Sequence, residues 1–97
     1  MKKRWIGAAI AAVLALGITI PLSAQNRQTE LLWLGQAAFK ITTPGGKTIV
    51  IDPWLKANPT TPAQYKNLDA LGKVDVLLVT HGHGDHLGDA PALAKMH

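Results

Sequence analysis

The feature that most constrains this chain is the hexapeptide His-Gly-His-Gly-Asp-His at residues 81–86, which holds three of its four histidines. In an extended segment, residues two apart point to the same side, so His81 and His83 can bind one ion together. The glycines between them let the backbone bend, and the bend turns Asp85 and His86 towards a neighbouring position. A carboxylate oxygen and an imidazole nitrogen there suit a second divalent ion. The hexapeptide therefore predicts a metal site.

The segment before the hexapeptide, residues 74–80, is almost continuously apolar. This composition predicts a strand that is buried on both faces of a sheet covered by helices. Asp75 within it is then either at an edge position or paired with another group. The alternative interpretation of the histidines is a run of exposed loop residues, but imidazoles packed this closely would repel one another on protonation.

A buried strand that ends in HGHGDH resembles the HxHxDH signature of the metallo-β-lactamase fold hydrolases. Three further stretches, at residues 33–39, 46–54 and 87–89, are similar to the branch of metal-dependent hydrolases related to ascorbate-6-phosphate lactonase. The resemblance covers residues 31–97. It implies an α/β fold, in which this chain forms the first half of an αβ/βα metallo-β-lactamase-type sandwich with the metals at the ends of the inner strands.

The activity that the resemblance implies is metal-dependent hydrolysis of a small-molecule substrate of the ester, lactone or phosphodiester type. His81 and His83 hold the first ion in this interpretation, and Asp85 and His86 hold the second. Asp85 also has a catalytic role, because it helps to orient a bridging hydroxide. Coordination lowers the pKa of water to about 7, so the nucleophile exists at neutral pH. The two divalent ions are expected to be zinc, with manganese or iron as alternatives, and the later ligands of the family lie beyond the matched region.

Asp52 ends the predicted strand at residues 48–51. In the resembled family the matching aspartate supports the histidine loop by hydrogen bonds and does not bind the metal. The alternative is an ordinary aspartate that ends a strand before Pro53. Trp54 either lines the substrate mouth or covers the core, and both interpretations stay open.

Gln36 is the position where this chain departs from the resembled branch, in which a histidine usually stands between a glycine and an alanine or serine. Glutamine forms hydrogen bonds but does not titrate near neutral pH. Gln36 is therefore predicted to position substrate or metal-bound water if its side chain reaches the site. The alternative is that it satisfies a backbone group of its own loop.

Alternating and continuous apolar patterns predict further elements along the chain. Gly45 and Gly46 indicate a hairpin turn between two of the strands, since no helix follows them. Gly72 is expected to stop the first helix, and Asp89 to cap the second. The predicted strands cover residues 30–34, 38–42 and 48–51, and the predicted helices run from Thr61 and Pro62 to Leu71, with Tyr65, Leu68 and Leu71 facing the core, and from Pro91 to the chain end.

Residues 1–24 have the layout of a secretory signal peptide, with a basic head, an apolar run at residues 5–20 and small residues up to Ala24. We predict cleavage after Ala24 and a periplasmic or envelope location. The alternative is an uncleaved membrane anchor, but a run of 16 residues is short for a span that needs about 20. Residues 25–97 then form the N-terminal part of a metallo-β-lactamase-like domain, truncated at its C-terminal side.

Charge and cysteine content exclude other classes of function. Three of the ten basic residues lie in the predicted signal segment, which leaves seven against six acidic ones. No clustered basic face with interleaved aromatics is present, so nucleic acid is not an expected partner, and membrane contact is expected only through the signal segment. The chain has no cysteine, which excludes disulfides and thiolate ligands. Two rival functions remain, a metal-dependent oxidoreductase of the same fold and a non-catalytic envelope metal-binding protein.

Overall fold

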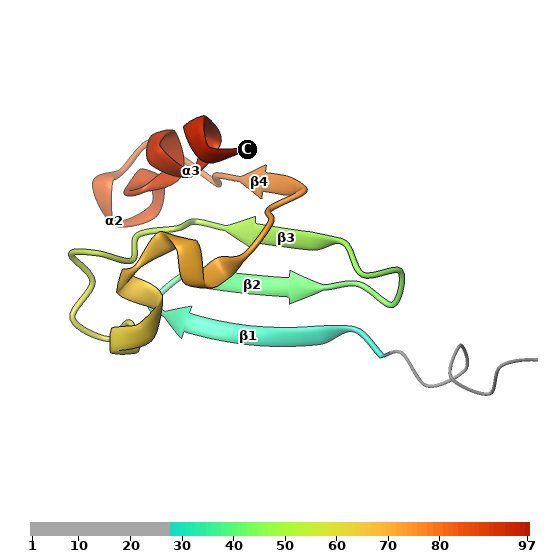
Figure 1. Cartoon of the computed structure of the whole chain (residues 1–97). Coiled ribbons are helices and arrows are strands. Elements are labelled where there is room, and N and C mark those ends of the chain that lie inside the picture. The colour runs from blue at the N-terminus through green and yellow to red at the C-terminus, as the bar shows by residue number, and fades with distance from the viewer. Residues whose placement is uncertain (1–27) are drawn as a thin grey trace, which may run out of the picture.

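The structure is a computed structural model that describes residues 28–97, and the predicted signal peptide lies outside the described residues (Figure 1). A four-stranded mixed sheet is its centre, with antiparallel pairing between the first three strands and parallel pairing between the last two. Three strands therefore run in the same direction, and their C-terminal ends lie together at one end of the sheet, beside α2 (Figure 1). In sheet order the strands are β1 (Glu30–Gly35), β2 (Ala38–Thr42), β3 (Thr48–Ile51) and β4 (Val76–Leu78).

One face of the sheet carries the hydrophobic core. It is covered by the two 3-10 helices η2 (Ala63–Lys66) and η3 (Leu68–Leu71), which lie in front of the sheet in Figure 1, and it receives Leu93 from α3 (Ala90–Met96). Side chains alternate along a strand, so every second residue of β1 to β3 points into this core. The buried core residues are Leu34, Ala38, Val50, Leu55, Leu68, Leu71, Val74 and Leu93.

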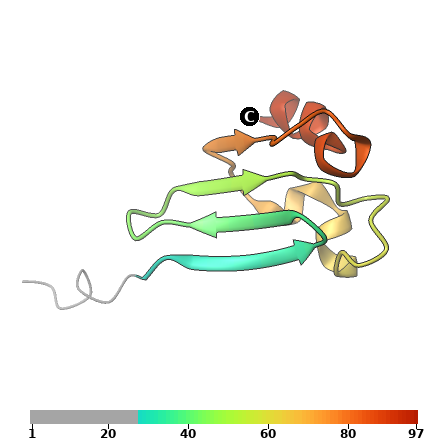
Figure 2. The same cartoon turned by 180° about the vertical axis from the view of Figure 1, so that it is seen from behind.

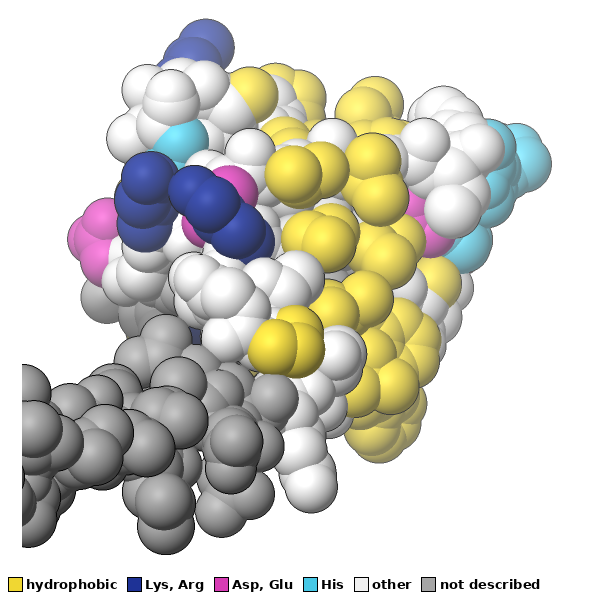
Figure 3. Space-filling view, turned by 90° about the vertical axis from the view of Figure 1, so that its right-hand side faces the viewer, with side chains coloured by type: hydrophobic (Ala, Val, Ile, Leu, Met, Phe, Trp, Pro, Cys, Tyr) yellow, Lys and Arg dark blue, Asp and Glu magenta, His cyan; other side chains and the backbone are white. Residues whose placement is uncertain are grey.

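The opposite face of the sheet is also apolar, and no described element packs against it (Figure 2). We call it the open face. Its side chains form two rows across the strands, which appear as a band of hydrophobic atoms on the right in Figure 3. The register places Leu31, Ile41, Ile49 and Val76 in one row and Trp33, Phe39, Ile51 and Leu78 in the other. This mixed α/β architecture confirms the fold class, the first half of an αβ/βα sandwich, in which a sheet has one face towards helices and the other towards a second sheet.

The predicted hairpin and its flanking strands are confirmed, but the prediction for residues 74–80 is wrong in two respects. The strand covers only Val76–Leu78, and within residues 28–97 it is an edge strand of the sheet. Val76 and Leu78 are 43% and 47% exposed because they lie on the open face. Asp75 precedes the strand and is paired: its carboxylate accepts from the Thr48 amide at 2.9 Å.

The prediction of one continuous helix up to Leu71 is also wrong. Asn67 has an extended backbone, and its side chain accepts a hydrogen bond from the Asp69 amide, so it ends η2 and begins η3. Thr61 forms no cap, since the N-cap residue of η2 is Pro62 and makes no side-chain hydrogen bond. Gly72 ends η3 as predicted.

Asp89 stands at the N-cap position of α3, but its side chain does not cap the helix. The carboxylate instead accepts hydrogen bonds from the backbone amides of Leu55 and Lys56, at 2.8 and 2.9 Å. Asp89 thus ties the start of α3 to the loop that follows β3. Within residues 28–97, the helices are all too short or too polar to cross a membrane.

Candidate metal centre

The candidate site lies at the end of the sheet where the C-terminal ends of β1, β3 and β4 come together. Gln36 follows β1, Asp52 follows β3, and Thr80 follows β4 by two residues. Because these strands run in the same direction, the three residues lie at the same end of the sheet although they are far apart in the sequence. The hexapeptide continues directly from Thr80, and its last three residues lie in the short helix α2 (Gly84–Leu87).

Asp52 is the buried centre of this arrangement, with 3% of its surface exposed. Its Oδ1 accepts a hydrogen bond from the Thr80 amide at 2.7 Å, and its Oδ2 accepts one from the Thr80 hydroxyl at 2.7 Å. Nδ1 of His86 lies 2.9 Å from the same Oδ2. Burial by itself raises the pKa of Asp52, but the hydrogen bonds from His86 and Thr80 outweigh it and hold the pKa below its ordinary value. Asp52 is therefore an ionised acceptor at neutral pH.

The contact with Asp52 decides which nitrogen of His86 is free. An ionised carboxylate can only accept hydrogen bonds, so Nδ1 of His86 must carry the proton. In the neutral imidazole, Nε2 then has the free lone pair. Histidine ligands of metal ions are commonly oriented in this way, with the second ring nitrogen donating to a carboxylate.

Thr80 determines the tautomer of His81 in a similar way. The hydroxyl of Thr80 has a single proton, and it donates this proton to Asp52. Towards Nδ1 of His81, 3.0 Å away, the hydroxyl can therefore only accept. Nδ1 of His81 carries the proton in the neutral ring, and its Nε2 has the free lone pair. One buried carboxylate thus fixes the tautomers of two histidines.

The three histidine rings of the hexapeptide lie close together. The ring centroids of His81 and His83 are 4.8 Å apart, and those of His81 and His86 are 4.0 Å apart. Figure 3 shows these side chains as a group at the edge of the molecule, next to the open face. His81 and His83 are exposed, whereas His86 is half-buried.

These residues fit a divalent ion by the chemistry of their donors. Two imidazoles have Nε2 as a free donor atom, and Asp85 adds a hard carboxylate oxygen. Across residues 28–97, however, no three histidine, aspartate or glutamate side chains are placed to hold one ion. The described residues therefore bring together pairs of ligands and do not form a closed cage.

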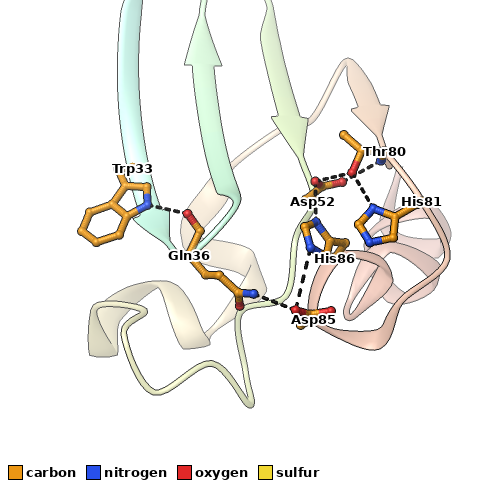
Figure 4. Close-up of polar contacts among 7 residues, drawn as sticks. All are labelled: Trp33, Gln36, Asp52, Thr80, His81, Asp85 and His86. Carbon is orange, nitrogen blue, oxygen red and sulfur yellow. Dashed lines mark hydrogen bonds and ion pairs between the residues drawn. The ribbon is translucent and has the colours of Figure 1, made fainter.

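Gln36 reaches the hexapeptide. Its Nε2 donates to Oδ2 of Asp85 at 2.7 Å, and the indole Nε1 of Trp33 donates to the Gln36 carbonyl at 2.9 Å. The hydrogen bond from Gln36 is the main reason why the pKa of Asp85 lies below its ordinary value. Figure 4 shows that these contacts form one chain, which runs from Trp33 through Gln36, Asp85, His86, Asp52 and Thr80 to His81.

Backbone strain is concentrated in the same place. Within residues 28–97, positive φ angles of non-glycine residues occur at Gln36 (48°) and Asp52 (47°). Each such residue costs about 1–3 kcal/mol and persists where the surroundings fix it, often at functional sites. The site thus combines strained turns with hydrogen bonds that hold them.

The loop after β3 is packed tightly against the end of α2. Gly88, which follows the helix, has a φ of 31°, and a Cβ atom there would lie 2.6 Å from Cα of Trp54. The Asp89 amide also donates to the Pro53 carbonyl at 2.8 Å. The backbone of Trp54 therefore lies against Gly88, the residue that follows α2.

Sequence reasoning missed Thr80 and Trp33. The apolar pattern predicts Thr80 only as the last residue of a strand, although a hydroxyl directly before a histidine at a strand end is a usable signal for a hydrogen bond to that ring. Trp33 carried no signal of this kind, since its contact with Gln36 depends on the conformation of the β1–β2 turn.

Comparison with known proteins gives a consistent result. Residues 30–97 match the model of the beta-lactamase superfamily domain. A protein named UPF0173 metal-dependent hydrolase from Polaromonas sp. is 74% identical over 69 residues, which are 71% of this chain and 25% of that protein. The protein of the same name from Cupriavidus metallidurans is 73% identical over 67 residues, 69% of this chain and 23% of the relative.

A third relative of the same name, from Polynucleobacter asymbioticus, is 53% identical over an alignment of 103 positions, which covers 98% of this chain and 36% of that protein. The chain thus spans about a quarter to a third of the length of the relatives that it matches. No solved structure matches it.

Proposed function

Because the chain belongs to the beta-lactamase superfamily, among its metal-dependent hydrolases, we propose that the protein hydrolyses a small-molecule ester, lactone or phosphodiester with the help of two divalent ions. His81 and His83 hold the first ion in this proposal, and Asp85 and His86 hold the second. Further ligands come from outside the residues described. A divalent ion supplies Lewis acidity and lowers the pKa of bound water to about 7.

The observation that carries the proposal is the triple contact of Asp52 with Thr80 and His86. A buried carboxylate that fixes the tautomers of two neighbouring histidines prepares their Nε2 atoms for ligation. Partners of this kind typically change metal affinity or activity by about 10- to 100-fold. An ordinary strand-ending aspartate has no reason to be buried and bonded to a histidine loop in this way.

The remaining residues divide the work of binding and orientation. His81 and His83 are exposed, so a substrate can approach the pair from solvent. Asp85 is ionised at neutral pH, as a hard ligand requires, and the hydrogen bond from Gln36 holds its pKa below the ordinary value. Asp52 keeps the rings in place and does not itself bind the ion.

The test compares two histidine variants of the purified protein. His83→Ala removes a proposed ligand, whereas His97→Ala removes the histidine outside the hexapeptide. We expect His83→Ala to lose bound metal and to stop hydrolysing a nitrophenyl ester or phosphodiester, and His97→Ala to match the parent protein in both. Full activity of His83→Ala, or of metal-free protein, would contradict the proposal.

The same preparations identify the ion. Imidazole and carboxylate ligands without thiolates suit zinc, manganese and iron, and zinc is the ion that we propose. Elemental analysis of the purified protein should give two ions per chain. A di-iron absorption spectrum would favour the oxidoreductase function, and metal binding without turnover of any hydrolase substrate would favour a metal-binding protein.

Export is a separate proposal, which rests on the basic head and apolar run of residues 1–24. Fractionation of cells that express the tagged protein should place it in the envelope, with an N-terminus near Gln25. Recovery from the cytoplasm with Met1 intact would contradict export but leave the hydrolase proposal untouched.

A further inference from the structure

We propose that Gln36 is a positioning residue for the second ion, because it holds the Asp85 carboxylate in one orientation beside His86, with lone pairs left for the metal. This inference rests on the proposed function and assigns a role within it. Gln36 contributes no ligand of its own in this role. It acts through Asp85, which is 49 residues away in the sequence, from the turn that follows β1.

The hydrogen bond between Gln36 and Asp85 has only one possible direction. Nε2 of Gln36 lies 2.7 Å from Oδ2 of Asp85, which is short for a hydrogen bond between nitrogen and oxygen. A carboxylate only accepts, so the amide nitrogen and not the amide oxygen must face it. The hydrogen bond therefore fixes both side chains: the amide in one orientation, and the carboxylate with Oδ2 towards Gln36.

The hydrogen bond from Gln36 leaves part of the Asp85 carboxylate for the metal. Oδ2 of Asp85 is engaged by the amide and lies 3.8 Å from Nε2 of His86. A carboxylate has about four lone-pair sites on its two oxygens, so the sites that Gln36 does not occupy remain for an ion. A glutamine donor has no charge and does not titrate, so it orients the ligand without competing with a cation for the site.

The position of Gln36 is itself fixed by its neighbours. The indole of Trp33 donates to the Gln36 carbonyl at 2.9 Å, and this holds the turn between β1 and β2. Gln36 occupies the left-handed region, with φ at 48°, which is unfavourable for a residue with a long side chain. Asparagine or glycine would suit that backbone better. The chain therefore has a long amide here in spite of its backbone preference, as expected if the reach of the side chain matters.

The turn between β1 and β2 is packed closely against another loop. Gly35 precedes Gln36, and a Cβ atom there would lie 2.7 Å from Oγ1 of Thr60 and 2.9 Å from the amide nitrogen of Thr61. The turn is thus pressed against the loop that follows β3, and it cannot move away from Asp85 without disturbing that loop. Trp33 and this loop together make Gln36 a rigid support.

The test separates the side chain of Gln36 from its backbone. Gln36→Asn keeps the amide and favours the left-handed backbone, but its side chain is one methylene too short to reach Asp85. Gln36→Gly removes the side chain and relieves the backbone. Gln64→Asn is the matched control, because Gln64 is an exposed glutamine in η2, outside the site.

The readout is metal affinity, measured by titrating the metal-free protein with zinc against a chromophoric chelator, together with the Tm of the metal-free protein. In Gln36→Asn and Gln36→Gly we expect one of the two zinc Kd values, that of the second ion, to rise by about 10- to 100-fold. The Kd of the first ion should stay nearly unchanged. The Tm of both variants should equal or exceed that of the parent protein. Trp33→Phe, which removes the indole N–H group but keeps an aromatic ring, should raise the same Kd by a smaller factor.

A purely structural role predicts the opposite pattern, with a lowered Tm and both affinities as in the parent protein and in Gln64→Asn. That result would overturn the inference and leave the hydrolase proposal standing. If the parent protein bound no zinc, the proposed function itself would fail, and the inference with it.

Discussion

Thr80 contacts Asp52 twice, through its backbone amide to Oδ1 and through its hydroxyl to Oδ2, both at 2.7 Å. This double contact joins the ends of β3 and β4, the parallel pair at one side of the sheet. It also uses the single hydroxyl proton of Thr80, so that the hydroxyl accepts from His81. A residue with no metal-binding atom of its own thereby decides which nitrogen of His81 is free.

Replacing Thr80 by valine should weaken metal binding, because valine keeps the shape of the side chain but has no hydroxyl. His81 is then free to take the other tautomer, and we expect the Kd of the first ion to rise by about 10-fold or more. The free energy of unfolding should fall by about 1–3 kcal/mol, since Asp52 loses a donor while it stays buried. Calorimetry with and without zinc measures both effects. Thr80→Ser keeps the hydroxyl and should restore affinity, and equal affinities of the valine and serine variants would contradict the role of the hydroxyl.

Gly88→Ala should destabilise the protein. The added methyl group would lie 2.6 Å from Cα of Trp54 and 3.0 Å from the Pro53 carbonyl oxygen, so the backbone must shift. Overpacking of this kind costs about 1–3 kcal/mol, which denaturant unfolding can measure. Gly82→Ala is the control, because a Cβ atom at Gly82 meets no other atom within 4 Å. Equal losses in the two variants would show that the contact with Trp54 is unimportant.

Much of the sheet was predictable because local patterns determine it. Alternating residues defined β1 to β3, and the glycine pair defined the hairpin between β2 and β3. The environment of β4 was not predictable, since an apolar run is compatible with burial on both faces or with an edge strand beside an open apolar face. Only the arrangement of the whole sheet decides between these.

The candidate site was predictable in its residues and not in its contacts. The hexapeptide and the strand-end position of Asp52 were visible in the sequence. The hydrogen bond between Gln36 and Asp85 was not, because it depends on a left-handed turn and on the relative position of segments that are 49 residues apart. The tautomers of the histidines likewise follow from distances to Thr80 and Asp52, which a sequence does not contain.

Asp75 should make stability depend on pH in the acid range. Its carboxylate accepts from the Thr48 amide at 2.9 Å and lies 3.3 Å from the ammonium group of Lys73 and 3.7 Å from that of Lys47. The Thr48 hydrogen bond first, and then the lysines, hold the pKa of Asp75 below its ordinary value. A lowered folded-state pKa stabilises the protein above the unfolded pKa of about 3.9, and this stabilisation is lost as the pH falls through the folded value.

Asp75→Asn should therefore lower the Tm at pH 7, and the difference from the parent protein should shrink as the pH falls below about 4. High salt should reduce the difference at pH 7 as well, because both lysines are exposed. Asp69→Asn, at an exposed aspartate in η3, serves as the control. A Tm difference for Asp75→Asn that stays constant from pH 7 to pH 3 would show that the charge of Asp75 does not contribute.

The open face should make the 97-residue chain bind hydrophobic dyes when it is expressed by itself. Sheets in sandwich folds pack face to face over apolar side chains, and the open face has this composition on all four strands. Replacing Val76 and Leu78 together by threonine keeps good strand formers but makes this end of the face polar. Dye fluorescence should fall while the Tm changes little, because both residues are nearly half exposed. Leu77→Thr, on the core side of the same strand, should instead lower stability by about 1–3 kcal/mol without reducing dye binding. If the double variant bound as much dye as the parent chain, the open face would not be the exposed apolar surface in solution.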